Sequence, residues 1–222
     1  MQKYLNILKT CPLFYGICDN ELLRMLSCLG ANIKPFSKKS TVSAEGSAAK
    51  NIGILLSGSL STFQIDYCGN RNLIEAVSPP KLFLEDFACA EVDAIPVTVV
   101  ATEPCEVMFI DCAHILHTCE SNCAFHRQMI FNLMKILAKK TVSFHQKFEV
   151  TSKRKTREKL LAYLNLEAKK NQSASFDIPF DRQQLADYLE VDRSGLSAEI
   201  SKLRDEGLLE SERKHFKLNT VS

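Results

Sequence analysis

The sequence has 222 residues, 45% hydrophobic and 24% charged, enough to build one large folded domain or two smaller ones. Its 28 basic and 26 acidic residues leave a net charge of +2, which excludes a globally basic nucleic-acid-binding protein but allows a local basic surface. No signal peptide or membrane-spanning run is visible, so we expect a cytoplasmic protein without a membrane partner, whose nine cysteines are mostly small buried side chains.

Apolar residues at helical spacing occupy residues 2–29, and Pro12 interrupts them. After Ile33, short apolar runs are separated by Gly, Ser, Asn and Pro. The runs are 52–60, 73–77, 96–101 and 106–110, with a hairpin loop at 66–70. Many short strands predict a β-sandwich or a barrel-like roll. With residues 44–46 (AEG) and 54–58 (ILLSG), the region resembles the double-stranded β-roll of cyclic nucleotide-binding domains.

Residues 119–148 predict one long helix. Seam residues recur every seven positions, with a second set four residues further on, which is the heptad pattern of a coiled coil. The predicted dimer seam consists of Cys123, Ile130, Met134, Leu137, Thr141, Phe144 and Phe148. A helix packed on its own domain would give the same pattern.

A hinge is predicted at residues 150–152. The basic run 152–159 follows, and it is either a DNA contact or a solvated helix start. A helix at 157–165 and a polar loop at 169–175 complete this part.

Residues 178–209 have the pattern of two short helices separated by three residues. Asp181 is in the N-cap position of the first helix, and Gln184 can complete a capping box. Asp192 is the expected N-cap of the second helix, and Gly207 is its expected C-cap. The predicted buried stripes consist of Leu185, Leu189, Leu196, Ile200 and Leu203.

The second helix has short residues opposite its apolar stripe, so it can enter a major groove, which is about 12 Å wide. Arg193 lies at its N-terminal end, where a guanidinium can bond a guanine bidentately. A turn at 210–214 and a strand at 215–218 predict a wing whose tip can reach phosphates. The predicted DNA contacts are Arg182, Gln183, Arg193, Ser194, Ser197, Ala198, Ser201, Lys202, Arg213 and Lys214. An ordinary helical hairpin in a small core has the same spacing.

Residues 181–189 (DRQQLADYL) and 191–194 (VDRS) resemble the winged helix-turn-helix of Crp/Fnr-type bacterial transcription regulators. The family's base-contacting arginine falls on Arg193. Ser194 and Ala198 replace two other common contacts, so the operator should differ from the best-known family sequence. The resemblance covers nearly the whole chain and implies an α+β fold in three parts. They are a β-roll sensor domain at 1–118, a dimerisation helix and hinge at 119–150, and a winged helix-turn-helix domain at 151–222.

The resemblance also implies partners. Because the family dimerises through the long helix, we expect a parallel homodimer on a two-fold-symmetric operator in double-stranded DNA, with recognition helices about 34 Å apart. A regulator that activates transcription also contacts RNA polymerase, and the sequence does not locate that surface.

In family members that bind cyclic nucleotides, a glycine, a glutamate, an arginine and a serine hold the ligand. Here Leu84 falls on the glycine and Ile95 on the arginine. Pro96 falls on the serine, and Glu85 alone is retained. Isoleucine cannot neutralise a phosphate and proline has no N–H to donate, so we predict no cyclic AMP or cyclic GMP binding. The pocket would take another, unknown small-molecule effector, or be filled by its side chains and bind nothing. The pocket segment comprises Phe83, Leu84, Glu85, Asp86, Ile95, Pro96 and Val97.

Fnr-type members carry a tight N-terminal cysteine cluster for an iron–sulfur centre. Cys11, Cys18 and Cys28 are too loosely spaced to match it, so we predict no cluster and no other cofactor. Cys119, Cys123 and His126 share one helical face. They could sense a metal or a redox change, or they could simply pack at the dimer seam. We do not assign a metal site.

Three classes of function remain to be compared. The first is a dimeric site-specific transcription regulator, which the helix-turn-helix pattern favours. The second is a cyclic nucleotide-binding-like module that acts through protein contacts without DNA. The third is an enzyme, which we reject because no phosphate-loop, nucleophile-elbow or metal-hydrolase motif is present.

Overall fold

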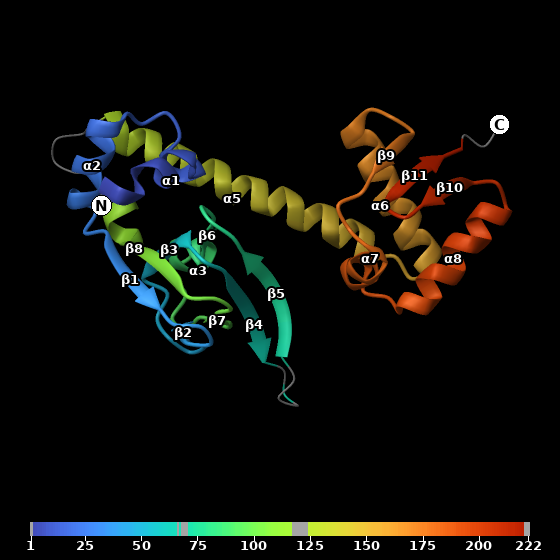
Figure 1. Ribbon diagram of the computed structural model, residues 1–222, viewed down its shortest axis with the longest axis horizontal. Coiled ribbons are helices and arrows are strands. Elements are labelled where there is room, and N and C mark those ends of the chain that lie inside the picture. The colour runs from blue at the N-terminus through green and yellow to red at the C-terminus, as the bar shows by residue number, and fades with distance from the viewer. Residues whose placement is uncertain (1, 66, 68–70, 117–123, 220–222) are drawn as a thin grey trace. The chain divides into compact units, whose positions relative to one another are not determined.

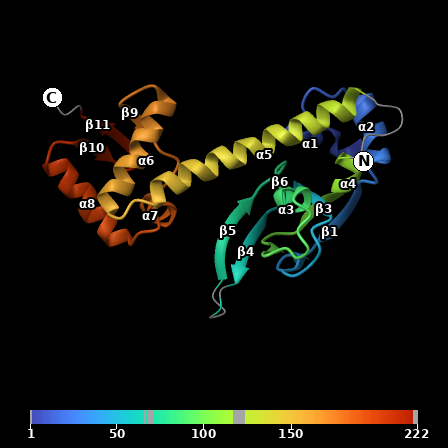
Figure 2. The same cartoon turned by 180° about the vertical axis from the view of Figure 1, so that it is seen from behind.

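The computed structural model describes residues 2–65, 67, 71–116 and 124–219 (Figures 1 and 2). The chain forms two compact units, one ending at Lys139 and the other beginning at Lys140. The first unit is rich in strands, and the second combines helices with a small sheet, as the α+β prediction requires. Within the described ranges, none of the helices has the length and apolar character of a membrane span.

Eight strands build the β-roll of the first unit. They are β1 (Asn32–Phe36), β2 (Thr41–Ser43), β3 (Asn51–Ser57), β4 (Leu60–Ile65), β5 (Arg71–Val77), β6 (Leu82–Phe83), β7 (Thr98–Ala101) and β8 (Cys105–Asp111). Their order is β1-β8-β3-β6 in one sheet and β2-β7-β4-β5 in the other, and all pairs are antiparallel. The four predicted strand-forming runs are confirmed. Apart from Tyr67, the predicted hairpin loop at 66–70 lies outside the described residues.

Strand β3 is buried on both faces, because successive side chains point to opposite sides of a strand. Leu55 packs with Val107 of β8 and Leu60 of β4 in a core shared by the two sheets. Ile54, on the other face, belongs to a second core that includes helical residues such as Leu26. The β3 segment therefore consists almost entirely of apolar residues.

Two glycines permit close approaches in this roll. A Cβ atom on Gly53 would lie 2.2 Å from the Phe83 ring, so only glycine lets that ring cover β3. Gly58 has φ +78° in the β3–β4 turn, and a Cβ atom there would lie 2.3 Å from the Pro104 carbonyl oxygen.

The helices of the first unit cover the outer face of the β3 sheet. They are η1 (Gln2–Tyr4), α1 (Leu5–Thr10), η2 (Pro12–Phe14), α2 (Asp19–Cys28), α3 (Glu85–Cys89), α4 (Cys112–Leu116) and the first part of α5 (Ala124–Thr151). Asn132 of α5 donates hydrogen bonds to the carbonyl oxygens of Leu13 (2.9 Å) and Tyr15 (2.8 Å). These bonds satisfy a buried amide and attach α5 to the N-terminal helices.

The second unit contains three further helices and a three-stranded antiparallel sheet. They are α6 (Thr156–Asn171), β9 (Ser175–Asp177), α7 (Arg182–Leu189), α8 (Arg193–Asp205), β10 (Leu209–Glu212) and β11 (His215–Leu218). The sheet order is β10-β11-β9. Its core includes Leu160, Leu185, Leu196 and Phe216. Each of α6, α7, α8 and β11 therefore contributes at least one fully buried residue.

The structure corrects three boundaries in this unit. The helix predicted at 157–165 continues to Asn171, so part of the predicted polar loop at 169–175 is helix or strand. The segment 210–212 is strand rather than turn, and only Arg213 and Lys214 make the turn. The polar composition of β10 concealed it, because only its first residue, Leu209, is buried.

Candidate nucleic-acid interface

Helix α7 begins with the predicted capping box. The Gln184 N–H donates to Asp181 Oδ1 (2.8 Å), and the Asp181 N–H donates to Gln184 Oε1 (2.9 Å). Each side chain thus satisfies a backbone donor that the helix itself cannot pair. The prediction from the sequence is confirmed.

Helix α8 begins at Arg193 because Asp192 caps it. The Gly195 N–H donates to Asp192 Oδ2 (2.8 Å), and the Ser194 hydroxyl donates to the same oxygen. Both bonds lower the pKa of the Asp192 carboxyl below its usual value, and the bond from Ser194 has the largest effect. At the other end, Gly207 adopts φ +72° and the Leu208 N–H reaches the carbonyl of Leu203 (3.0 Å), a glycine-based helix stop.

The apolar stripe of α8 is buried, and the opposite face is exposed as predicted. Leu196, Ile200 and Leu203 are at most 3% exposed. The exposed face consists of Arg193, Ser194, Ser197, Ala198, Ser201 and Lys202. Two of its three hydroxyls are already used within the chain, since Ser194 donates to Asp192 and Ser201 donates to the Ser197 carbonyl (3.2 Å). Within the described residues the Arg193 side chain makes no hydrogen bond or ion pair, so its guanidinium is available.

Arg182 and Gln183 differ in how far their side chains are available to contact DNA. The Arg182 guanidinium lies 5.0 Å from the centre of the Phe216 ring, and its Nη2 donates to Ser211 Oγ (3.3 Å). These contacts hold the side chain between α7 and the wing, and its burial there lowers the pKa of Arg182. Gln183 is exposed and donates to Asp187 Oδ1 (2.8 Å), a bond that a DNA acceptor can replace.

The wing is the β10–β11 hairpin, with Arg213 and Lys214 at its tip. Arg213 is exposed and has φ +51°. Lys214 turns back, because its Nζ donates to the Pro179 carbonyl oxygen (2.9 Å). Of the two predicted wing cations, Arg213 is therefore the one whose exposed side chain is available to contact a phosphate.

Two cations of the basic run at 152–159 bind groups within the chain, which neither of the two explanations considered for the run predicted. Arg157 binds Glu206 through both Nη atoms, and Lys159 Nζ donates to the carbonyls of Leu189 (3.1 Å) and Glu190 (3.3 Å). These two cations hold the domain together and stabilise the end of α7. The cations of residues 153–155 are exposed.

The predicted pocket segment lies in the first unit, around α3. Leu84, at the glycine position of the family pattern, has φ +62°, a backbone conformation that glycine adopts easily. Asp86 Oδ1 accepts from the Phe87 N–H (3.1 Å) at the start of α3. Ile95 is 3% exposed in the core of the roll, and its N–H donates to the Ser47 carbonyl (2.9 Å). Of the seven predicted pocket residues, the buried ones are Phe83, Leu84, Glu85, Ile95 and Val97, whereas Asp86 and Pro96 are exposed.

The predicted seam of α5 is partly exposed. Ile130 and Leu137 are half-buried against the core of the first unit. Met134, Phe144 and Phe148 are 62%, 68% and 64% exposed. Thr141 is also exposed, and Cys123 lies outside the described residues.

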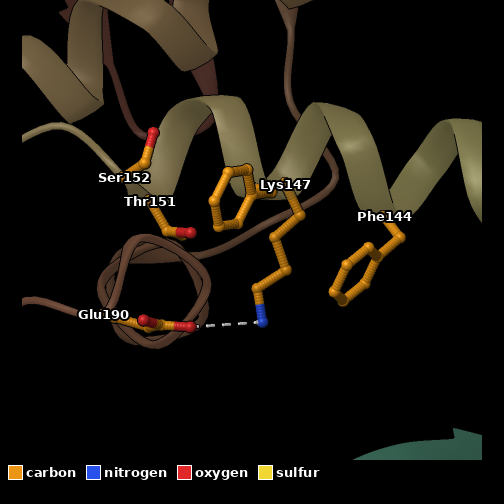
Figure 3. Close-up of a pocket in the computed structure, with 6 residues that line it drawn as sticks. Phe144, Lys147, Thr151, Ser152 and Glu190 are labelled. Atoms are coloured by element: carbon orange, nitrogen blue, oxygen red, sulfur yellow. Dashed lines mark ion pairs between the residues drawn. The ribbon is translucent and has the colours of Figure 1, made fainter.

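A pocket of about 390 Å³ lies beside the end of α5 in the second unit (Figure 3). Phe144 and Lys147 project from α5, and Lys147 Nζ lies 3.6 Å from Glu190 Oε1 (Figure 3). Its lining residues are Phe144, Lys147, Phe148, Thr151, Ser152 and Glu190. The sequence predicted Phe144 and Phe148 as seam residues. It did not predict the contact between Lys147 and Glu190, because Lys147 lies on α5 and Glu190 is the C-cap of α7.

Only His126 of the group considered for metal or redox sensing (Cys119, Cys123 and His126) is among the described residues. Cys119 and Cys123 lie outside the described residues. His126 is buried, and its Nε2 forms a hydrogen bond with the Ile115 carbonyl (2.7 Å). Of the N-terminal cysteines, Cys11 is fully buried, whereas Cys18 and Cys28 are exposed.

Two domain families match the sequence. The cyclic nucleotide-binding domain matches residues 33–122, and the Crp-like helix-turn-helix domain matches residues 158–221. A comparison with curated protein sequences gives no match.

Solved structures with the same fold cover most of the chain. The catabolite activator protein of Thermus thermophilus is 19% identical, with a TM-score of 0.50 over 94% of this chain and 93% of that chain. The c-di-GMP responsive global regulator CLP of Xanthomonas campestris is 16% identical, with a TM-score of 0.56 over 90% and 100%. DNR of Pseudomonas aeruginosa is 17% identical, with a TM-score of 0.52 over 99% and 95%. At these identities the likeness establishes the fold.

Proposed function

Because this chain is a Crp/Fnr-type DNA-binding transcription regulator, we propose that it acts as a homodimer on a two-fold-symmetric operator in duplex DNA. The exposed face of α8, with Arg193 at its N-terminal end, carries the proposal. We assign the protein no catalytic role. Its place of action is the cytoplasm, where an operator would be available.

Base recognition is assigned to Arg193. Its side chain is exposed on the first residue of α8, and the residues behind it on this face are serine and alanine, which let the helix approach the groove floor. Arg213 at the wing tip supplies a phosphate contact that positions the domain without selecting a sequence. Arg182 is assigned mainly to holding the wing, since its guanidinium is packed on Phe216.

Dimerisation is assigned to the exposed apolar side of α5. Met134, Phe144 and Phe148 are large side chains that water surrounds in the single chain, and such residues at heptad spacing pack in the holes of a partner helix. Ile130 and Leu137 contribute at the edge, because they also pack on their own unit.

The sensor is proposed not to recognise cyclic AMP or cyclic GMP. Ile95 lies in the apolar core where the family pattern has an arginine, and its N–H is already bonded to Ser47. The carboxylate of Asp86 occupies the Phe87 N–H at the start of α3, so an anion would meet a negative charge there. An apolar or cationic effector, or none, fits these residues better.

Selection of bound duplexes from a random pool tests this function. The purified protein is used without added ligand, in parallel with Arg193→Ala. Enrichment of a two-fold-symmetric site by the wild type, and loss of its preferred base by the variant, are expected. If neither the reduced nor the peroxide-treated protein enriches any site, and added cell extract does not restore enrichment, the DNA-binding proposal is wrong. The protein would then be reassigned as an interaction module.

A further inference from the structure

Two cysteines that are far apart in the sequence meet in the first unit. Cys89 is the last residue of α3, Cys112 is the first residue of α4, and their Sγ atoms are 3.5 Å apart. They are 23 positions apart, so no spacing pattern in the sequence reveals the pair. The contact forms because the chain between them crosses the roll twice, through β7 and β8.

The two thiols differ in exposure and in acidity. Cys112 is 4% exposed, whereas Cys89 is only partly buried. The hydrogen bond between the two thiols lowers the pKa of Cys112 and raises that of Cys89. Negative charges on Glu85 and Asp86 also raise the pKa of Cys89, so an anionic oxidant would be repelled and a neutral one favoured.

We propose that Cys89 and Cys112 form a redox-active dithiol that a neutral peroxide closes to a disulfide. In the first step Cys89 passes its proton to the Cys112 sulfur across their hydrogen bond, and the Cys89 sulfur takes an oxygen from the peroxide. The O–O bond breaks, sulfur loses two electrons, and the products are a sulfenic acid and water, or an alcohol from an organic peroxide. In the second step Cys112 sulfur attacks the sulfenic sulfur of Cys89. The S–S bond forms, and the hydroxyl leaves as water with the Cys112 proton.

This disulfide would close a loop that contains part of the proposed pocket. Ile95, Pro96 and Val97 lie between the two cysteines, and Leu84 at the start of α3 lies just before them. Oxidation would therefore tie the end of α3 to the start of α4 and restrict how the pocket segment can move. A resulting change in operator affinity rests on the proposed DNA-binding function, whereas formation of the bond does not.

Peptide mapping of the full chain tests the bond directly. The reduced protein is treated with hydrogen peroxide, free thiols are alkylated, and the chain is cleaved after glutamate. Cys89 lies in the peptide 86–91, and Cys112 lies in 107–120 together with Cys119. A linked pair of these peptides, lighter by two hydrogens, is expected in the wild type and in the control Cys28→Ser, which removes an exposed thiol. The link should persist in Cys119→Ser and disappear completely in both Cys89→Ser and Cys112→Ser.

Two results would overturn the assignment. One is a Cys89 thiol that remains alkylatable at a peroxide dose that fully oxidises Cys28. The other is a link that survives in Cys112→Ser but not in Cys119→Ser, which would identify Cys119 as the partner. Because Cys89 is only half-buried, Cys89→Ser should fold even if Cys112→Ser does not. Neither result depends on DNA, so failure here is distinguishable from failure of the regulator proposal.

Discussion

Arg157 and Glu206 are joined by a two-pronged ion pair. Nη1 of Arg157 donates to Oε1 of Glu206 (2.9 Å), and Nη2 donates to Oε2. A second carboxylate, that of Glu199, lies 3.6 Å from Nη1. Arg157 is in the first turn of α6, Glu199 is on α8 and Glu206 is its C-cap, so the ion pair fixes the C-terminal end of α8.

This ion pair predicts a loss of stability in acid. The Arg157 guanidinium lowers the pKa of Glu206 in the folded protein below its ordinary value. Its contribution is therefore present above the unfolded-state pKa and is lost as the pH falls through the lowered folded-state pKa. We expect Glu206→Gln to lower Tm at neutral pH, with the gap to wild type closing in acid as the pH falls through the lowered folded-state pKa of Glu206. Glu212→Gln, at an exposed wing position, is the control, and an equal gap at neutral and acid pH would contradict the role of the pair.

Replacement of Arg193 by alanine should cost about 1–3 kcal/mol of binding free energy at one symmetric base position. The reason is the loss of a bidentate contact to a base edge, with α8 still capped by Asp192. Titration of duplexes with each base substituted in turn measures it. Unchanged preference at every position would remove Arg193 as the base-recognising residue.

Replacement of Arg213 by alanine should have a different signature. A phosphate contact carries no sequence information, so affinity should fall by a similar factor for every duplex. The slope of log affinity against log salt should decrease by about 1. Lys214→Ala is the matched variant, and it should change the slope less because Lys214 is bonded to the Pro179 carbonyl. The opposite ranking would reverse the assignment at the wing tip.

A charge on the exposed part of α5 should separate the dimer. Phe144→Glu places like charges across the seam in an apolar setting, and 68% of the phenylalanine is exposed in the single chain, so the fold should not need it. Sedimentation should show monomers at concentrations where the wild type is dimeric. Leu137→Glu is a poorer choice, because Leu137 packs on its own core. Lys139→Glu, at an exposed position of the same helix outside the seam, is the control, and a Phe144→Glu dimer would show that the seam lies elsewhere.

Cyclic AMP should not stabilise the protein. A ligand that binds only the folded state raises Tm once its concentration exceeds its Kd, so at about 1 mM nucleotide any useful affinity would be visible. We expect no shift, because the core residue Ile95 stands where a phosphate-binding cation would be needed. A rise in Tm that inorganic phosphate does not reproduce would refute the loss of the nucleotide site.

The features that the sequence predicted correctly are local ones. Asp181 and Gln184 are three residues apart, and a capping box needs only that spacing and the right side chains. The stripe Leu196, Ile200 and Leu203 follows from the period of a helix, and the strand-forming runs follow from their apolar composition. Because these signals lie within a few residues of one another, the two capped helices and the strand-forming segments could be inferred from the sequence alone.

Contacts between distant segments could be decided only by the tertiary structure. In the structure Arg157 forms an ion pair with Glu206, and the Arg182 guanidinium packs on the Phe216 ring. The tertiary structure also brings Cys89 against Cys112. Each of these partners lies more than 20 positions away, and their meeting depends on how sheets and helices pack, which the residue types alone do not encode in any local pattern.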